Sequence, residues 1–166
     1  MKEILASKSP SICANVLNGK ANVLIFKKFP KDYKGWIDLY CTKDKNYQLV
    51  IGGDGFGTKE YCNSKHYPPF IVSDILNSKV VARFWCDKVE EITYYPKKPF
   101  DRYGTPYRAT YDLLIESCLE YDELDNYLNK NNGYAIHITK LEIFDKPKEL
   151  WQFKTPKNAE RYRRDL

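Results

Sequence analysis

The chain has 166 residues, of which 43% are hydrophobic and 30% are charged, and its formal net charge is +5. These values predict one folded domain with its own hydrophobic core and exclude an intrinsically disordered chain. No apolar run approaches the roughly 18 to 20 residues that a membrane-spanning helix needs, which argues against a membrane partner.

The first part of the chain predicts one helix and several strands. Ser9 and Pro10 indicate the start of a helix over residues 9–17, because serine caps helix N-termini and proline fits the first helical position. Gly19 ends this helix. Strands are predicted over residues 3–6, 22–29, 36–41 and 47–51, and the last of these is a candidate partner of the one before it.

Residues 52–77 contain a glycine-rich run over 52–57, and this run is predicted to be a flexible loop. A dinucleotide-binding glycine motif lies between a strand and a helix, and the residues after this run do not open a helix. Farther along, the sequence predicts a strand over 79–86 that continues over 89–95, a loop over 96–106, a helix over 121–128 and a long strand over 134–144.

About six strands and two or three short helices, without an alternating βαβ order, predict an α+β fold. The simplest architecture is a small, mostly antiparallel β-barrel with the helices at its rim, because closure removes exposed strand edges. We expect one domain over residues 1–153, with insertions near 52–77 and 96–117, followed by a basic C-terminal tail over 154–166.

The five cysteines are widely spaced, at positions 13, 41, 62, 86 and 118, and form no Cys-x-x-Cys pair. This pattern predicts reduced, half-buried thiols rather than a disulfide framework. It also gives no set of zinc ligands, although His66 lies near Cys62, so we expect neither a metal nor a cofactor. The N-terminal residues carry no apolar signal region, which predicts a cytoplasmic protein.

Basic residues concentrate at both ends of the chain. Residues 1–35 hold seven lysines against two acidic residues, and the tail from residue 154 holds five basic residues against two acidic ones. The segment 116–125 is acidic instead. This distribution favours a footprint for a polyanion on one face, although an ordinary solvated surface is nearly as compatible with a net charge of +5.

Three stretches resemble the ASCH family of PUA-like domains, especially small members found in Gram-positive bacteria and their phages. They run from Ile4 through Pro10 and Gly19 to Lys43, over NSKVVARFWCDKVEEI at 77–92, and over 118–150 with GYAIHITKLEIFDKPKEL from Gly133. The resemblance implies a pseudo-barrel with a cleft on one side and the binding of RNA or a nucleotide. It also implies that some small members are amidohydrolases acting on acetylated cytidine, or ribonucleases.

The sequence departs from this family at the positions that the family uses for chemistry. The family usually has Gly-x-Lys-Thr-x-Glu-x-Arg after the first helix, with the last three polar residues on the strand face that lines the cleft. Aligned on Gly19, its four polar positions fall on Ala21, Asn22, Leu24 and Phe26. Because the amine and the carboxylate are both replaced, catalysis is not expected.

The predicted function is therefore non-catalytic binding of RNA or a nucleotide. Asn22 would hydrogen-bond a base edge and Phe26 would stack on the base, which is worth about 1 to 3 kcal/mol per base. The alternative for Phe26 is that the cleft is filled and the ring is packed in the core. The predicted ligand-binding residues, with lysines near phosphates, are Lys8, Ser9, Lys20, Asn22, Phe26, Lys27, Lys28 and His137. For His137, a hydrogen-bonded structural role is the alternative.

Tyrosines and arginines near 96–117 predict a surface contact formed by Arg102, Tyr103, Tyr107 and Arg108. Such residues suit single-stranded nucleic acid and equally suit a protein interface. The alternative function is therefore an inhibitor, encoded by a phage or mobile element, that binds a host protein such as a defence or CRISPR component. Residual amidohydrolase or ribonuclease activity is a second alternative.

Overall fold

The structure is a computed structural model, and it describes residues 4–53, 59–64, 75–96, 106–109, 112–152 and 160–163. Arg102 and Tyr103 of the predicted surface contact lie outside these residues. In chain order the elements are β1 (Ile4–Lys8), α1 (Pro10–Leu17), β2 (Val23–Phe26), β3 (Gly35–Cys41), β4 (Gln48–Gly53), β5 (Lys59–Ser64), β6 (Lys79–Tyr94), β7 (Tyr107–Arg108), α2 (Leu113–Ser117), α3 (Tyr121–Leu128), β8 (Gly133–Glu149), the 3₁₀ turn η1 (Leu150–Gln152) and β9 (Glu160–Arg163).

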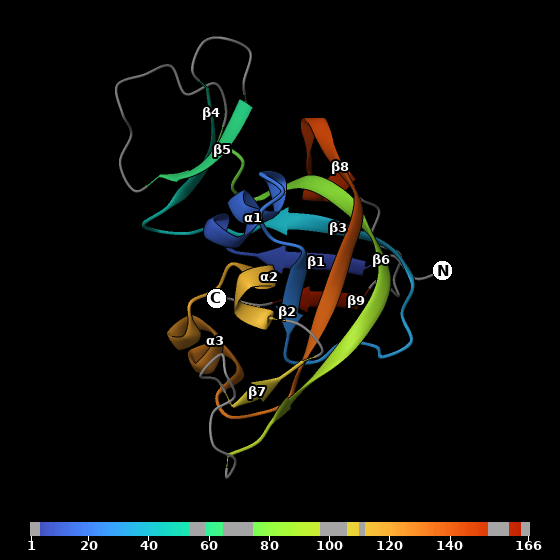
Figure 1. Ribbon diagram of the computed structural model, residues 1–166. Helices are drawn as coiled ribbons and strands as arrows, with labels where there is room; N and C mark the ends of the chain where they lie inside the picture. Colours follow the sequence, from blue (N-terminus) through green and yellow to red (C-terminus); the bar gives the residue numbers. More distant parts are fainter. Residues whose placement is uncertain are drawn as a thin grey trace.

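The main sheet has seven strands and confirms the α+β class (Figure 1). Its order is β2-β8-β6-β3-β1-β9, and β7 pairs with the far end of β6. The pairs are antiparallel except that β1 runs parallel to both β3 and β9. The two end strands of this order are β2 and β9, and within the described residues no pairing joins them into a closed barrel.

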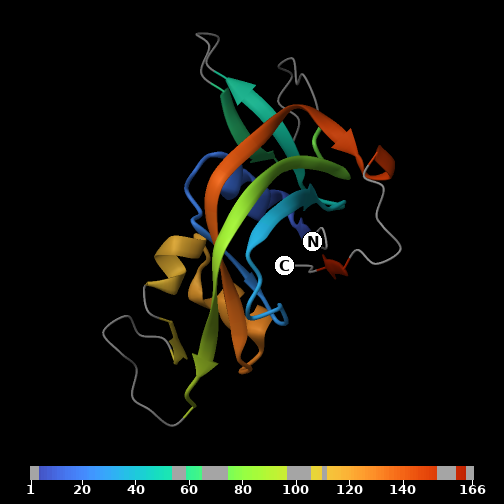
Figure 2. The same cartoon turned by 90° about the vertical axis from the view of Figure 1, so that its right-hand side faces the viewer.

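β6 and β8 form the long ribbon on which the sheet is built. They contain 16 and 17 residues and pair along most of their length, with shifts of register, one of them between Cys86 and Val89 of β6. Such irregularities bend a strand pair, and Figure 2 shows both strands curving across the molecule. The two strands predicted over 79–86 and 89–95 are thus one strand with a bend.

The caps of α1 and α3 confirm both predicted helices. The Ser9 Oγ accepts a hydrogen bond from the Ile12 N–H, and Pro10 occupies the first helical position. Before α3, the side chains of Glu120 and Glu123 form a capping box. These local signals fix helix ends without help from the rest of the fold.

The prediction that residues 47–51 pair with 36–41 is wrong. Both edges of β3 are occupied, by β6 and β1, so β4 has no edge of β3 to join. β4 pairs instead with β5, which lies inside the predicted insertion near 52–77, and the two form a separate hairpin that projects from the main sheet (Figure 1).

Two asparagines bond to the outer edges of this hairpin. The Asn18 carboxamide accepts from the Tyr61 N–H at 2.9 Å and donates to the Tyr61 carbonyl at 2.7 Å. On the β4 side, Asn77 accepts from the Leu49 N–H at 2.7 Å and donates to the Tyr47 carbonyl at 3.0 Å. Each side chain therefore satisfies backbone groups that a further strand would otherwise pair with.

Two further segments contain elements that were not predicted from the sequence. α2 and β7 form within the insertion predicted near 96–117, and the Asp112 side chain caps α2 by accepting from the Ile115 N–H. β9 lies within the predicted basic tail, yet it pairs in parallel with β1 and so belongs to the sheet. Within the described residues, no helix is both long enough and apolar enough to cross a membrane.

Candidate ligand pocket

A pocket of about 490 Å³ opens between the first turn of α1, the turn after β3, and α3. This volume falls within the roughly 300 to 1,000 Å³ of typical small-molecule sites. Its walls carry two tyrosines, two carboxylates, an amide and two hydroxyl groups. The lining residues are Ser9, Pro10, Ser11, Ile12, Asp44, Tyr47, Leu119, Glu123, Asn126 and Tyr127.

The α1 wall presents the start of a helix. Pro10 has no N–H, the Ile12 N–H donates to the Ser9 Oγ at 3.4 Å, and the Cys13 N–H donates to the Ser9 carbonyl at 3.0 Å. The exposed Ser11 follows Pro10, and in the described part of the chain its N–H has no helical partner. This wall can therefore offer a ligand a backbone donor and a hydroxyl group.

The second wall is the turn that follows β3. The Asp44 Oδ1 accepts from the N–H groups of Asn46 and Tyr47, at 2.8 and 2.9 Å. A side chain that bonds its own backbone in this way holds a tight turn. As a result the Tyr47 ring, which is 38% exposed, stands at the pocket on an ordered turn.

The third wall is α3, which contributes Glu123, Asn126 and Tyr127. The Glu123 Oε2 already accepts from the Glu120 N–H at 2.8 Å, as part of the capping box. Asn126 is exposed, whereas Tyr127 is only 4% exposed. The Nζ atoms of Lys8 and Lys27 lie 5.2 and 5.4 Å from the centroid of the Tyr127 ring. Two cations therefore approach the ring of one lining residue.

Lys8 is close to the pocket but is completely buried. On β1 it points to the core together with Ile4 and Ala6, and its Nζ donates to the Ile25 carbonyl of β2. The same atom lies 3.9 Å from the centroid of the Phe26 ring. A buried ammonium group needs such compensation. Lys8 thus links β1 to β2 inside the molecule rather than lying at the surface near phosphates, as was predicted.

Phe26 is packed in the core. Its side chain is 1% exposed and its ring centroid is 5.3 Å from that of Phe29, while the neighbouring Leu24 is 2% exposed. The ring therefore presents no open face on which a base could stack, and the predicted stacking by Phe26 does not fit this geometry. At this strand the structure agrees with the alternative, a cleft filled by apolar side chains.

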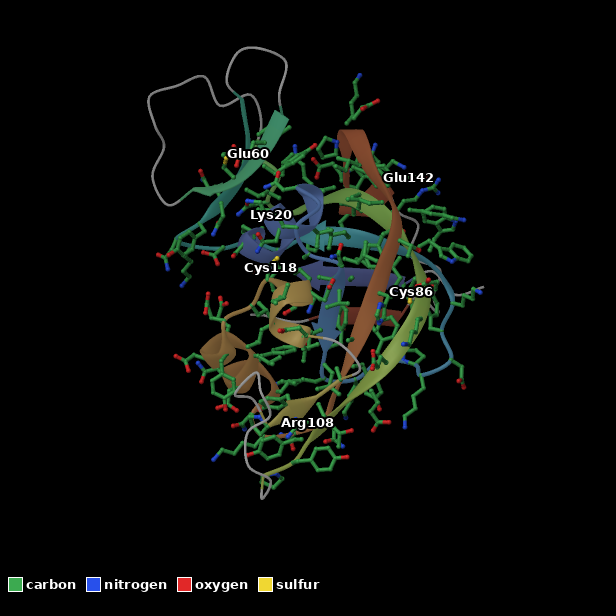
Figure 3. The ribbon with its side chains drawn as sticks, viewed as in Figure 1. Lys20, Glu60, Cys86, Arg108, Cys118 and Glu142 are labelled. Carbon is green, nitrogen blue, oxygen red and sulfur yellow. The ribbon has the colours of Figure 1, made fainter. Side chains whose placement is uncertain are left out.

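Of the other predicted ligand-binding residues, Ser9 lines the pocket and the exposed Lys27 lies beside Tyr127. Lys28 is exposed and is not part of the lining. Lys20 and Asn22 lie near α2: Asn22 donates to the Glu116 Oε2 at 2.7 Å, and Figure 3 shows Lys20 near Cys118. The structure therefore places Ser9 in the pocket wall and Lys27 beside a lining residue, whereas Lys20, Asn22 and Lys28 are not part of the lining.

His137 lies on β8, outside the pocket lining. Its Nε2 is 3.5 Å from the Oε2 of Glu90 on β6, and the two side chains are 24% and 9% exposed. The Lys88 Nζ lies 3.8 Å from the same carboxylate oxygen. The structure therefore places His137 beside a buried carboxylate on β6 and away from the pocket lining.

Tyr107 is a structural residue rather than part of a surface contact. It is 2% exposed, and its hydroxyl group donates to the Asp125 Oδ1 at 2.7 Å and accepts from the Lys130 N–H at 3.0 Å. Burial, followed by the bond to Asp125, raises the pKa of this phenol above its usual value. The side chain therefore ties β7 to α3, and the prediction for Tyr107 is wrong. Arg108 is half-buried at the β7 end of the molecule (Figure 3).

Sequence reasoning missed most of the lining residues, although two local signals could have indicated some of them. The spacing of Asp44 and Asn46 is typical of a tight turn that would display the next residue, Tyr47. Tyr127 lies three residues after Leu124, on the buried face of α3. No local signal indicates that these segments meet.

Comparisons with family models, with curated proteins and with solved structures gave no match for this chain. The function must therefore be argued from the resemblance in the sequence and from the pocket itself.

Proposed function

We propose that this chain is a non-catalytic ASCH-like domain of PUA-like fold that binds RNA or a nucleotide, with one base entering the pocket between α1 and α3. The observation that carries the proposal is the pocket of about 490 Å³ with Tyr47 and Tyr127 in its walls. The α+β architecture and the mostly antiparallel sheet are compatible with that fold.

The chemistry of the lining favours a base over a phosphate inside the pocket. Tyr47 offers a partly exposed aromatic ring for stacking, and the amide of Asn126 can both donate to and accept from a base edge. Asp44 and Glu123 carry negative charge in the same lining, which disfavours a phosphate there. A base can approach these carboxylates through its N–H groups.

Phosphates would lie outside the pocket, where lysines are available. Lys43 and Lys45 are exposed on either side of Asp44, and the exposed Lys27 lies beside Tyr127. A neutral base in the pocket with its phosphates toward these side chains satisfies both sets of charges.

We propose binding rather than catalysis because the candidate catalytic groups hold the fold together. The Asp44 and Glu123 carboxylates accept backbone N–H groups of a turn and a helix cap, and the Lys8 amine donates to the Ile25 carbonyl. The positions that would carry the family's lysine and glutamate are Ala21 and Leu24.

Fluorescence polarisation with labelled single-stranded RNA, single-stranded DNA and duplex, at low and moderate salt, tests the proposal. Tyr47→Ala should weaken RNA binding roughly 5- to 150-fold, the equivalent of about 1 to 3 kcal/mol of stacking. The matched control is Tyr95→Ala, since Tyr95 is 40% exposed against 38% for Tyr47 and is not part of the lining. No binding at low salt, or equal losses in both variants, would contradict the proposal. Salt-tolerant binding to a protein would instead favour the inhibitor hypothesis.

A further inference from the structure

The fold brings together two cysteines that are far apart in the sequence. Cys13 lies in α1 and Cys41 ends β3, and both side chains are completely buried. Cys41 stands opposite Lys8 in the β1–β3 pairing, and the Cys13 Sγ donates to the Lys8 carbonyl at 3.6 Å. The Cys41 side chain is also close enough to raise the pKa of the Cys13 thiol. The two thiols are therefore direct neighbours, and both are reduced in the structure.

The two cysteines lie next to the segments that form two of the three pocket walls. Cys13 directly follows the turn from Ser9 to Ile12 that forms the α1 wall, and Cys41 directly precedes the segment that supplies Asp44 and Tyr47. A covalent bond between the two sulfur atoms would consequently join the α1 wall to the wall after β3, while leaving α3 unattached.

We propose that Cys13 and Cys41 form a modification site at which a hydroperoxide converts the two thiols into a disulfide, and that this bond weakens ligand binding in the adjacent pocket. The effect on binding rests on the proposed function, whereas formation of the disulfide does not.

The reaction balances with a hydroperoxide as the oxidant. One thiol loses its proton, and its sulfur attacks a peroxide oxygen, forming a sulfenic acid and releasing water from hydrogen peroxide or an alcohol from an organic peroxide. The second sulfur displaces the hydroxyl group from the first, and this group leaves as water with the second thiol proton. Two thiols are thereby oxidised by two electrons, and the peroxide is reduced by two electrons.

The disulfide must change the pocket because the sulfur atoms move closer together. A disulfide bond is about 2.05 Å long, much shorter than a contact between two thiols, and Cys13 can no longer donate to the Lys8 carbonyl. A close-packed interior does not absorb such a movement locally. The first turn of α1 therefore shifts toward β3 and away from its position relative to α3.

The same surroundings make the reaction slow at neutral pH. Burial, and then contact with Cys41 on β3, raise the pKa of the Cys13 thiol well above its usual value, while the nearby Lys8 on β1 acts in the opposite direction. Only the thiolate is the nucleophile. A raised pKa leaves less thiolate near pH 7, so the rate of disulfide formation should increase as the pH rises.

Mass spectrometry of the peroxide-treated protein tests the disulfide. Before alkylation we expect a loss of two hydrogen atoms, about 2 Da. After the remaining thiols are alkylated in denaturant, we expect a peptide joining Cys13 to Cys41 that dithiothreitol separates. Cys13→Ala and Cys41→Ala should each abolish this peptide, and the control Cys62→Ala should retain it. In the intact chain the disulfide should raise the midpoint of thermal unfolding by roughly 6 to 12 °C. Full alkylation of both cysteines after treatment would overturn the proposal.

The effect on the pocket is measured by polarisation with the same labelled single-stranded RNA. The oxidised protein should need a higher concentration than the reduced protein to reach half-saturation, dithiothreitol should reverse the change, and Cys13→Ala should not respond to peroxide. A disulfide that leaves RNA affinity unchanged would overturn the regulatory part. Absence of binding by the reduced protein would contradict the proposed function, while mass spectrometry would still decide whether the disulfide forms.

Discussion

Lys8 and Lys27 both approach the ring of Tyr127, but only Lys27 is exposed. Lysines are rarely buried, and both were accordingly predicted to lie near phosphates at a binding cleft. The alternation of β1 could have corrected this for Lys8, because it shares a strand face with Ile4 and Ala6. The sequence therefore predicts that the Lys8 side chain points to the core. It does not predict that the Ile25 carbonyl and the Phe26 ring contact the ammonium group there.

Adjacent lysines at the end of β2 should differ in their effect on RNA binding. Lys27→Glu should weaken binding and lower the slope of log affinity against log salt by about 0.7, the value for one lost phosphate contact on a single strand. Lys28→Glu is the matched control, because Lys28 is also exposed but has no ring contact with Tyr127 among the described residues. Polarisation titrations at several salt concentrations measure both slopes. Equal changes in the two variants would remove Lys27 from the site.

Among the helices and strands, the sequence predicts those that short-range signals determine. The helices over 9–17 and 121–128 are confirmed because their caps and apolar spacing are short-range signals. β5 was missed because it is a short, mostly polar strand, and it is held by the Asn18 side chain, 43 residues away. β9 was missed because a basic segment forms a strand only when the edge of β1 is available.

Removing the Asn18 side chain should open the edge of β5. In Asn18→Ala, the Tyr61 N–H and carbonyl both lose their partner, so the Tyr61 amide should exchange with deuterium roughly 5 to 30 times faster. The control is Asn15→Ala, since Asn15 lies in the last turn of α1, which Asn18 follows, and its side chain makes no hydrogen bond in the described part of the chain. Hydrogen exchange measured at single amides distinguishes the two, and unchanged protection of Tyr61 in Asn18→Ala would refute this role.

At the scale of the whole molecule, the pocket depends on contacts that the sequence does not reveal. Its walls come from residues 9–12, 44–47 and 119–127, which meet only because the sheet order places β1 beside β3 and the helices beside them. The local structure of each segment could be predicted separately. Their contact in space could not, because it results from the pairing of strands that are far apart in the sequence. For the same reason the α+β class was predictable, whereas the pairing of β4 and the contact between Cys13 and Cys41 were not.

The central claim is that a base of single-stranded RNA occupies the pocket. The most direct measurement is a nuclear magnetic resonance titration of the isotope-labelled 166-residue chain with a short single-stranded oligoribonucleotide at low salt. We predict that the largest amide shifts occur at Ser11, Tyr47 and Asn126, one on each wall of the pocket. Shifts confined to another surface, or no shifts at all, would contradict the claim.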